Sequence, residues 1–109
     1  MGEFRMWINY QNGSTIGESG TENGNIIFDE EHVDGARITL EQNCHQNIPF
    51  AITSGIYGGI VHTTFASDKI EATLKYNKMK LCIEEGLGIC KLAGETEMSS
   101  WVEQFCNQY

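Results

Sequence analysis

The fold class is decided by two neighbouring stretches, IPFAITSGIYGGIVHTTF (Ile48–Phe65) and SDKIEATLKYNKMKLCIEEG (Ser67–Gly86). The first has no Asp, Glu, Lys or Arg, is rich in β-branched side chains and is interrupted by glycines. Such a run is typical of strands joined by a tight turn, so we expect adjacent central strands over Ile48–Ser54 and Gly59–Phe65. The second stretch has helical periodicity. Together they indicate a sheet with a helix packed on it.

That helix is expected over Asp68–Glu85, with Ser67 as its N-cap and Gly86 as a left-handed residue just past its end. At 100° per residue, the helix carries two apolar stripes on nearly opposite sides. One consists of Ile70, Leu74 and Leu81, and the other of Ala72, Tyr76, Met79 and Ile83. One stripe would cover the sheet. The other needs a second helix or a partner.

A second helix is indicated at the end of the chain. Ser100 and Glu103 have the spacing of a capping box, which favours a helix over Ser100–Gln108, although a start near Thr96 fits equally well. Apolar residues recur along it at helical spacing. We therefore expect Trp101, Phe105 and Leu81 to share one core.

The N-terminal half is expected to supply the remaining strands. Alternation over Phe4–Tyr10 is typical of a half-buried strand, whereas Gln11–Asn25 is rich in Gly, Ser, Asn and Thr. The latter indicates a loop or mobile hairpin, with one short strand around Thr15–Glu18.

The segment Asn25–Gln42 is typical of a hairpin, and its side-chain pattern distinguishes two registers. A two-residue turn would place Leu40 opposite Asp29 and mix core and charged residues on one face. A three-residue turn, Val33–Gly35, places Leu40 opposite Phe28 instead, and we expect this register. It leaves one wetter face that carries Asp29, Glu31, Arg37, Thr39 and Glu41. The whole chain, 1–109, is then a single α+β domain. We expect an antiparallel meandering sheet of about five to six strands, with two C-terminal helices packed on one face.

The charge of the chain limits the classes of molecule that it can bind. Seven Lys and Arg face 15 Asp and Glu, which gives a formal net charge of −8 that repels nucleic acid and anionic membrane surfaces alike. No apolar run approaches a membrane span, and the first residues lack the pattern of a secretory signal. The expectation is a cytoplasmic protein that binds neither nucleic acid nor membrane.

Four cysteines, Cys44, Cys82, Cys90 and Cys106, form no CxxC pair. The pattern favours free thiols in a reducing compartment, and a secreted, disulfide-bonded fragment is the alternative. Closely spaced ligand pairs are missing, so no metal and no cofactor are expected.

The sequence gives only weak support for a catalytic role. Cys44 lies next to His45, with His62 as a base elsewhere, but neighbours in sequence do not direct a histidine at the sulfur. The glycines of SGIYGG match no phosphate-binding loop, and a turn explains them better. A small enzyme or ligand-binding protein that uses Cys44 and His62, or a cavity between sheet and helix, is the second hypothesis.

The first hypothesis is a small acidic protein-binding module, such as an inhibitor or immunity-type protein that neutralises a basic toxin or nuclease. In size and charge, but in no motif, the chain resembles bacterial immunity proteins in general. Residues 1–50 hold eight acids and only two arginines, so a basic protein partner is expected to dock there. The residues predicted to bind it are Glu18, Glu22, Asp29, Glu30, Glu31, Asp34, Arg37 and Glu41.

Overall fold

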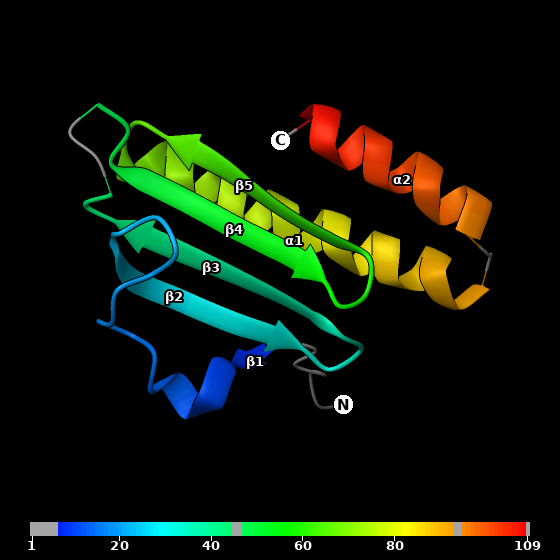
Figure 1. Cartoon of the computed structure of the whole chain (residues 1–109), viewed down its shortest axis with the longest axis horizontal. Coiled ribbons are helices and arrows are strands. Elements are labelled where there is room, and N and C mark those ends of the chain that lie inside the picture. The colour runs from blue at the N-terminus through cyan, green and yellow to red at the C-terminus, as the bar shows by residue number, and fades with distance from the viewer. Residues whose placement is uncertain (1–6, 45–46, 93–94, 109) are drawn as a thin grey trace.

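The computed structural model describes residues 7–44, 47–92 and 95–108, with side chains described over 7–44, 47–88 and 101–108 (Figure 1). This part of the chain forms five strands, a 3-10 helix and two α-helices. The strands are β1 (Trp7–Asn9), β2 (Asn25–His32), β3 (Ala36–Gln42), β4 (Phe50–Ile56) and β5 (Ile60–Ala66); the helices are η1 (Tyr10–Gly13), α1 (Lys69–Leu92) and α2 (Glu95–Gln108). The strands lie in the order β1-β2-β3-β4-β5, and each neighbouring pair is antiparallel. The predicted meandering α+β fold is confirmed.

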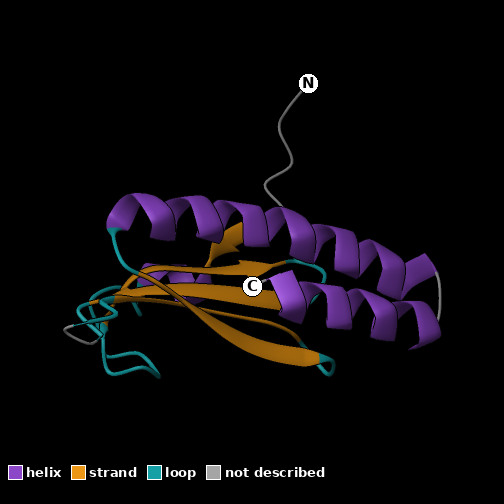
Figure 2. Cartoon of the chain, turned by 90° about the horizontal axis from the view of Figure 1, so that it is seen from above, coloured by secondary structure: helices purple, strands orange, loops and turns teal. Residues whose placement is uncertain are grey.

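Both α-helices lie on one side of the sheet. Helix α1 crosses that face and contacts β3, β4 and β5, while α2 packs beside α1 (Figure 2). The opposite sheet face carries no α-helix among the described residues (Figure 2). None of the helices in the described ranges combines the length and apolar character needed to cross a bilayer.

The β2–β3 hairpin has the predicted register. Its turn is the three-residue Val33–Gly35, with Gly35 at φ 108°, and Phe28 pairs with Leu40. The β4–β5 hairpin also has a three-residue turn, Tyr57–Gly59, because Ile56 pairs with Ile60. Within the described sheet, β5 pairs only with β4, so the predicted central position of Gly59–Phe65 is wrong and this strand is an edge strand.

The core lies between the sheet and α1. Fully buried Ile38, Leu40 and Ile52 project from β3 and β4 on this side. They meet the stripe of α1 formed by Ala72, Tyr76, Met79 and Ile83, to which α2 adds Trp101 and Phe105. Burial of these apolar surfaces is the main stabilising contribution to the fold. Trp101 and Phe105 are in the core as predicted, but Leu81 is 67% exposed, so its assignment to that core is wrong.

Both predicted ends of the first helix need correction. The N-cap is Asp68 rather than Ser67, because Asp68 Oδ1 accepts the backbone N–H of Glu71 at 2.8 Å. Gly86 lies inside α1, which continues to Leu92. A Cβ at Gly86 would come within 2.6 Å of the Trp101 indole, so this glycine allows α2 to approach α1 closely.

The N-terminal strand ends at Asn9, one residue before its predicted end, and residues 4–6 lie outside the described part. On β1, Trp7 packs against the core while Ile8 is half exposed. The Thr15–Glu18 segment forms turns rather than a strand, and Ser19 makes an isolated bridge to Asn25. Helix α2 starts at Glu95, nearer the earlier of the two predicted starts.

Candidate functional site

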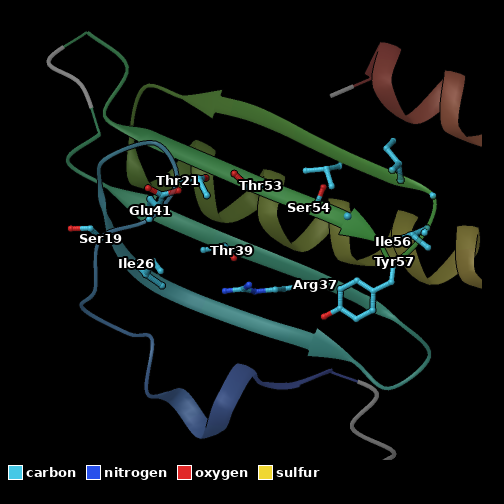
Figure 3. A pocket seen from close by; sticks show the side chains of 16 residues that line it. Ser19, Thr21, Ile26, Arg37, Thr39, Glu41, Thr53, Ser54, Ile56 and Tyr57 are labelled. Atoms are coloured by element: carbon cyan, nitrogen blue, oxygen red, sulfur yellow. The ribbon is translucent and has the colours of Figure 1, made fainter.

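The candidate site is a groove of about 830 Å³ on the sheet face opposite the helices (Figure 3). The loop that connects η1 to β2 closes one end, and the β4–β5 turn bounds the other. Figure 3 shows Glu41 and Thr21 at the first end, Tyr57 at the second, and Thr39 and Thr53 between them. The groove is therefore a shallow trough that runs along the middle strands.

Small side chains make the floor of the groove. Thr39 lies on β3 opposite Thr53 on β4, and Thr53 Oγ1 is 3.1 Å from Thr63 Oγ1 on β5. Two residues further along β4, Gly55 leaves the floor bare, and a Cβ there would come within 2.6 Å of the Ile60 carbonyl oxygen. Hydroxyl groups and exposed backbone thus face the groove.

A buried carboxylate anchors the β2 side of this face. Asp29 is 1% exposed, and it accepts two hydrogen bonds from Arg37, Nε to Oδ1 at 2.9 Å and Nη2 to Oδ2 at 2.7 Å. Thr15 and Thr39 also donate to it, at 2.8 and 3.3 Å. The hydrogen bond to Asp29 raises the pKa of Arg37, although burial opposes this shift. The guanidinium carbon of Arg37 lies 3.7 Å from the centre of the Tyr10 ring, so Arg37 joins η1 to the sheet.

A second buried carboxylate lies at the loop-covered end. Glu41 is 1% exposed, and its Oε1 accepts the backbone N–H groups of Glu22 at 3.2 Å and Gly24 at 3.1 Å. Its Oε2 is buried and has no hydrogen-bond partner in the described residues. A Cβ at Gly20 would overlap the Glu41 side chain, so the loop passes directly over this carboxyl. A buried carboxylate oxygen without a partner is costly, which makes Glu41 the most unusual group of the groove.

The opposite end is built by the two hairpin turns. The Tyr57 N–H donates to the Gly35 carbonyl oxygen at 2.9 Å, so the two turns are joined. The Tyr57 hydroxyl donates to Glu31 Oε2 at 2.6 Å. Desolvation, followed by the hydrogen bond to Glu31 and its charge, raises the pKa of Tyr57 to about 12. Tyr57 therefore stays neutral at physiological pH and forms the wall at this end.

The predicted partner-binding residues are only partly brought together. As the hairpin register predicts, Asp29, Glu31, Arg37 and Glu41 share the open face of the sheet, and Glu18 and Glu22 lie in the loop that crosses it. Asp34 is exposed at the β2–β3 turn. However, Asp29 and Glu41 are buried within the chain, and Asp29 is paired with Arg37.

Glu30 lies on the other face of the sheet. Its Oε1 accepts hydrogen bonds from the Tyr76 hydroxyl at 2.6 Å and from Lys80 Nζ at 2.9 Å, both on α1. Alternation along β2 explains this placement, because Asp29 and Glu31 face the groove and the residue between them must face α1. The carboxylate of Glu30 is thus paired beneath the helix.

The residues that shape the groove were missed by sequence reasoning. Thr53, Gly55 and Tyr57 belong to the β4 region, which was interpreted only as buried strand and turn. A signal was present, since Ala51, Thr53 and Gly55 fall on alternate positions of β4 and mark one of its faces as small.

The two residues of the alternative hypothesis do not meet. Cys44 lies near Gly24 and Glu41, and burial, followed by the charges of Glu41 and Glu22, raises the pKa of its thiol. A raised thiol pKa opposes nucleophilic use. His62 faces the helices, 5.7 Å from the Phe105 ring, and its buried Nε2 has no hydrogen-bond partner in the described residues.

The thiols of Cys44 and Cys106 are free, and the side chain of Cys90 lies outside the described residues. In the described ranges, no three His, Cys, Asp or Glu side chains gather as a metal site would require. A scan against protein-family models and searches of curated proteins and of solved structures found no match to this chain.

Proposed function

We propose that this chain is a small acidic protein-binding module that receives a basic partner protein on its open sheet face, as an inhibitor or immunity-type protein would. The observation that carries the proposal is the groove of about 830 Å³ with the Glu41 carboxylate beneath one end. An uncovered, hollowed sheet face can accept a protruding loop of a partner, and its charge selects a basic one.

The electrostatics of the groove support a cationic partner. The chain has a net charge of −8, and the exposed carboxylates of Glu18 and Asp34 lie near opposite ends of the open face. Glu41 needs no direct contact to contribute, because the field of a half-satisfied carboxylate extends into a groove with low-dielectric walls. The exposed acids would accelerate encounter, and the groove would fix the orientation of the partner.

The second candidate function is the binding of a small molecule in the same groove. Its volume lies within the range of roughly 300–1,000 Å³ that is common for ligand pockets. The hydroxyls of Thr39 and Thr53 and the phenol of Tyr57 could orient such a ligand. The two candidate functions respond differently to substitution. Charge reversal of the exposed acids should weaken mainly the binding of a protein partner.

The test is to capture partners with the tagged chain, identify them by mass spectrometry, and measure association of the purified pair by stopped flow. Two variants probe the site: E18K/E22K reverses charge on the loop, and Thr53→Tyr fills the groove. Their matched controls lie on exposed positions of α2, Glu103→Lys for charge and Gln104→Tyr for bulk.

We expect the association rate with a basic partner to fall about tenfold in E18K/E22K and again at high salt, and the dissociation rate to rise in Thr53→Tyr. The controls should leave both rates unchanged. A partner that binds all four variants equally, or whose association is indifferent to salt, contradicts the proposal. Loss of a small ligand in Thr53→Tyr alone would favour the second candidate.

A further inference from the structure

Helix α1 carries an apolar stripe on its outer side that the described chain does not cover. Ile70 is 76% exposed, Leu74 58% and Leu81 67%, values unusual for three large aliphatic residues of one helix. Figure 2 shows α1 as the outermost layer of the molecule, with α2 beside it rather than over it. The second helix packs on the side where Gly86 meets Trp101.

The stripe is continuous along the helix. Leu74 follows Ile70 by four residues and Leu81 follows Leu74 by seven, so the three side chains lie within about 40° of one another around the axis. They extend for about 16 Å along α1. Their line is therefore long enough to pack against another helix.

The charges that flank the stripe are arranged asymmetrically. Lys78 precedes Leu81 by three residues and Glu85 follows it by four, and both project on the same flank of the stripe. Two α1 helices packed antiparallel about an axis at Leu81 would place each Lys78 beside Glu85 of the other copy. A parallel two-fold arrangement would instead place this flank of the two copies on opposite sides of the interface, so Lys78 and Glu85 would not pair. The pattern is self-complementary in one direction only.

We propose that two copies of this chain associate through α1, packed antiparallel with Leu81 near the two-fold axis. The interface is isologous, with the stripe Ile70, Leu74 and Leu81 at its centre and the Lys78–Glu85 pairs at its rim. It is separate from the groove and does not rest on the function proposed for it.

A second copy fits this surface because the Lys78–Glu85 pattern is complementary to itself. Helix α1 carries five lysines and three glutamates, whereas the acidic excess of the chain is gathered in residues 1–50, on β2, β3 and the loop across the open face. Pairing through α1 turns both open faces away from the two-fold axis. The repulsion between two chains of charge −8 is thereby kept small.

The test is the oligomeric state of the full chain, measured by sedimentation equilibrium at several concentrations. Leu81→Glu should raise the dimer dissociation constant about a hundredfold, because it places a charge against its own symmetry copy in an apolar contact. Val61→Glu is the matched control: Val61 is 81% exposed and apolar, but it lies on the open face. Circular dichroism establishes that each variant is folded.

The charge pairs give a second, independent readout. Lys78→Glu should weaken the dimer about tenfold, and K78E/E85K should restore it, because the swap recreates both pairs. A wild-type chain that is monomeric at about 100 μM overturns the proposal. So does a folded Leu81→Glu variant that dimerises like the wild type, or a double variant no tighter than Lys78→Glu.

Discussion

Asp29 is the side chain whose loss should destabilise the open face most. Its carboxylate is bonded to Arg37, Thr15 and Thr39, and Asp29→Asn would leave the guanidinium without its charged partner. Because the Arg37 side chain is 35% exposed, water would compensate part of the loss. We expect the free energy of unfolding to fall by about 2–3 kcal/mol, measured by urea denaturation. Glu18→Gln, at an exposed position, should change it by less than about 0.5 kcal/mol, and equal effects would contradict this assignment.

Two glycines of α1 should respond in opposite ways to alanine. Gly88→Ala should stabilise the protein by up to about 1 kcal/mol, because a Cβ there meets nothing within 4 Å and alanine favours the helix. Gly86→Ala should destabilise it by about 1–3 kcal/mol, since the Cβ would press on the Trp101 indole. Thermal unfolding of the two variants gives the comparison. Stabilisation by both would mean that α2 does not pack closely on α1.

These residues also mark how far the sequence could be interpreted. The face shared by Asp29 and Glu41 follows from the hairpin register, because period-two alternation and a glycine-containing turn are local properties. The burial of Asp29 and Glu41 cannot be predicted in this way, since their partners Thr15 and Gly24 belong to a loop without periodicity. A glycine in a helical pattern can mark the end of the helix or a place where another helix comes close. For Gly86, only the contact with Trp101 distinguishes the two.

At the scale of elements, the contact between β2 and α1 should make stability depend on alkaline pH. Burial, followed by the hydrogen bond to Glu30 and its charge, raises the pKa of Tyr76 far above the ordinary value of 10. The folded protein thus holds a proton that the unfolded chain releases above about pH 10, so this stabilisation is complete below pH 10 and lost above it.

The expected loss is up to about 1.4 kcal/mol per pH unit above pH 10 from this group. Tyr76→Phe should be less stable than wild type by about 1–2 kcal/mol at pH 7, because the bond to Glu30 is gone, and should lose less stability at higher pH. Urea midpoints from pH 7 to 11 give the comparison. Parallel pH profiles for the two proteins would be inconsistent with a buried, protonated Tyr76.

The elements themselves were largely predictable, but the choice between the two stripes of α1 was not. Both stripes are apolar and similar in length, so helical periodicity alone could not say which one meets the sheet. Tyr76 decides it, because its hydroxyl reaches Glu30 on β2 while its ring packs in the core. The edge position of β5 was unpredictable for a related reason. An uncharged strand can lie in the centre of a sheet, or it can lie at the edge and be covered by a helix, and the sequence pattern is the same in both cases.

For the whole molecule, the excess of negative charge should make stability depend on salt. The internal pairs Asp29–Arg37 and Glu30–Lys80 each join one acid to one base, so they leave the net charge of −8 unchanged. Added salt screens the repulsion among the remaining carboxylates more than it weakens the partly buried pairs. We expect the melting temperature to rise between about 20 and 300 mM NaCl. A fall would indicate that the ion pairs dominate.

The meandering order of strands has a consequence for how the chain is made. Because each described strand pairs with its neighbour in sequence, β2 to β5 can pair one after another as they leave the ribosome. Their apolar face, with Ile38, Leu40 and Ile52, stays uncovered until α1, which starts at Lys69, packs on it. At 5–20 residues per second, translation of the 24 residues of α1 takes about 1–5 s. During that interval the nascent sheet exposes its future core, and it is then that a chaperone would protect the chain most.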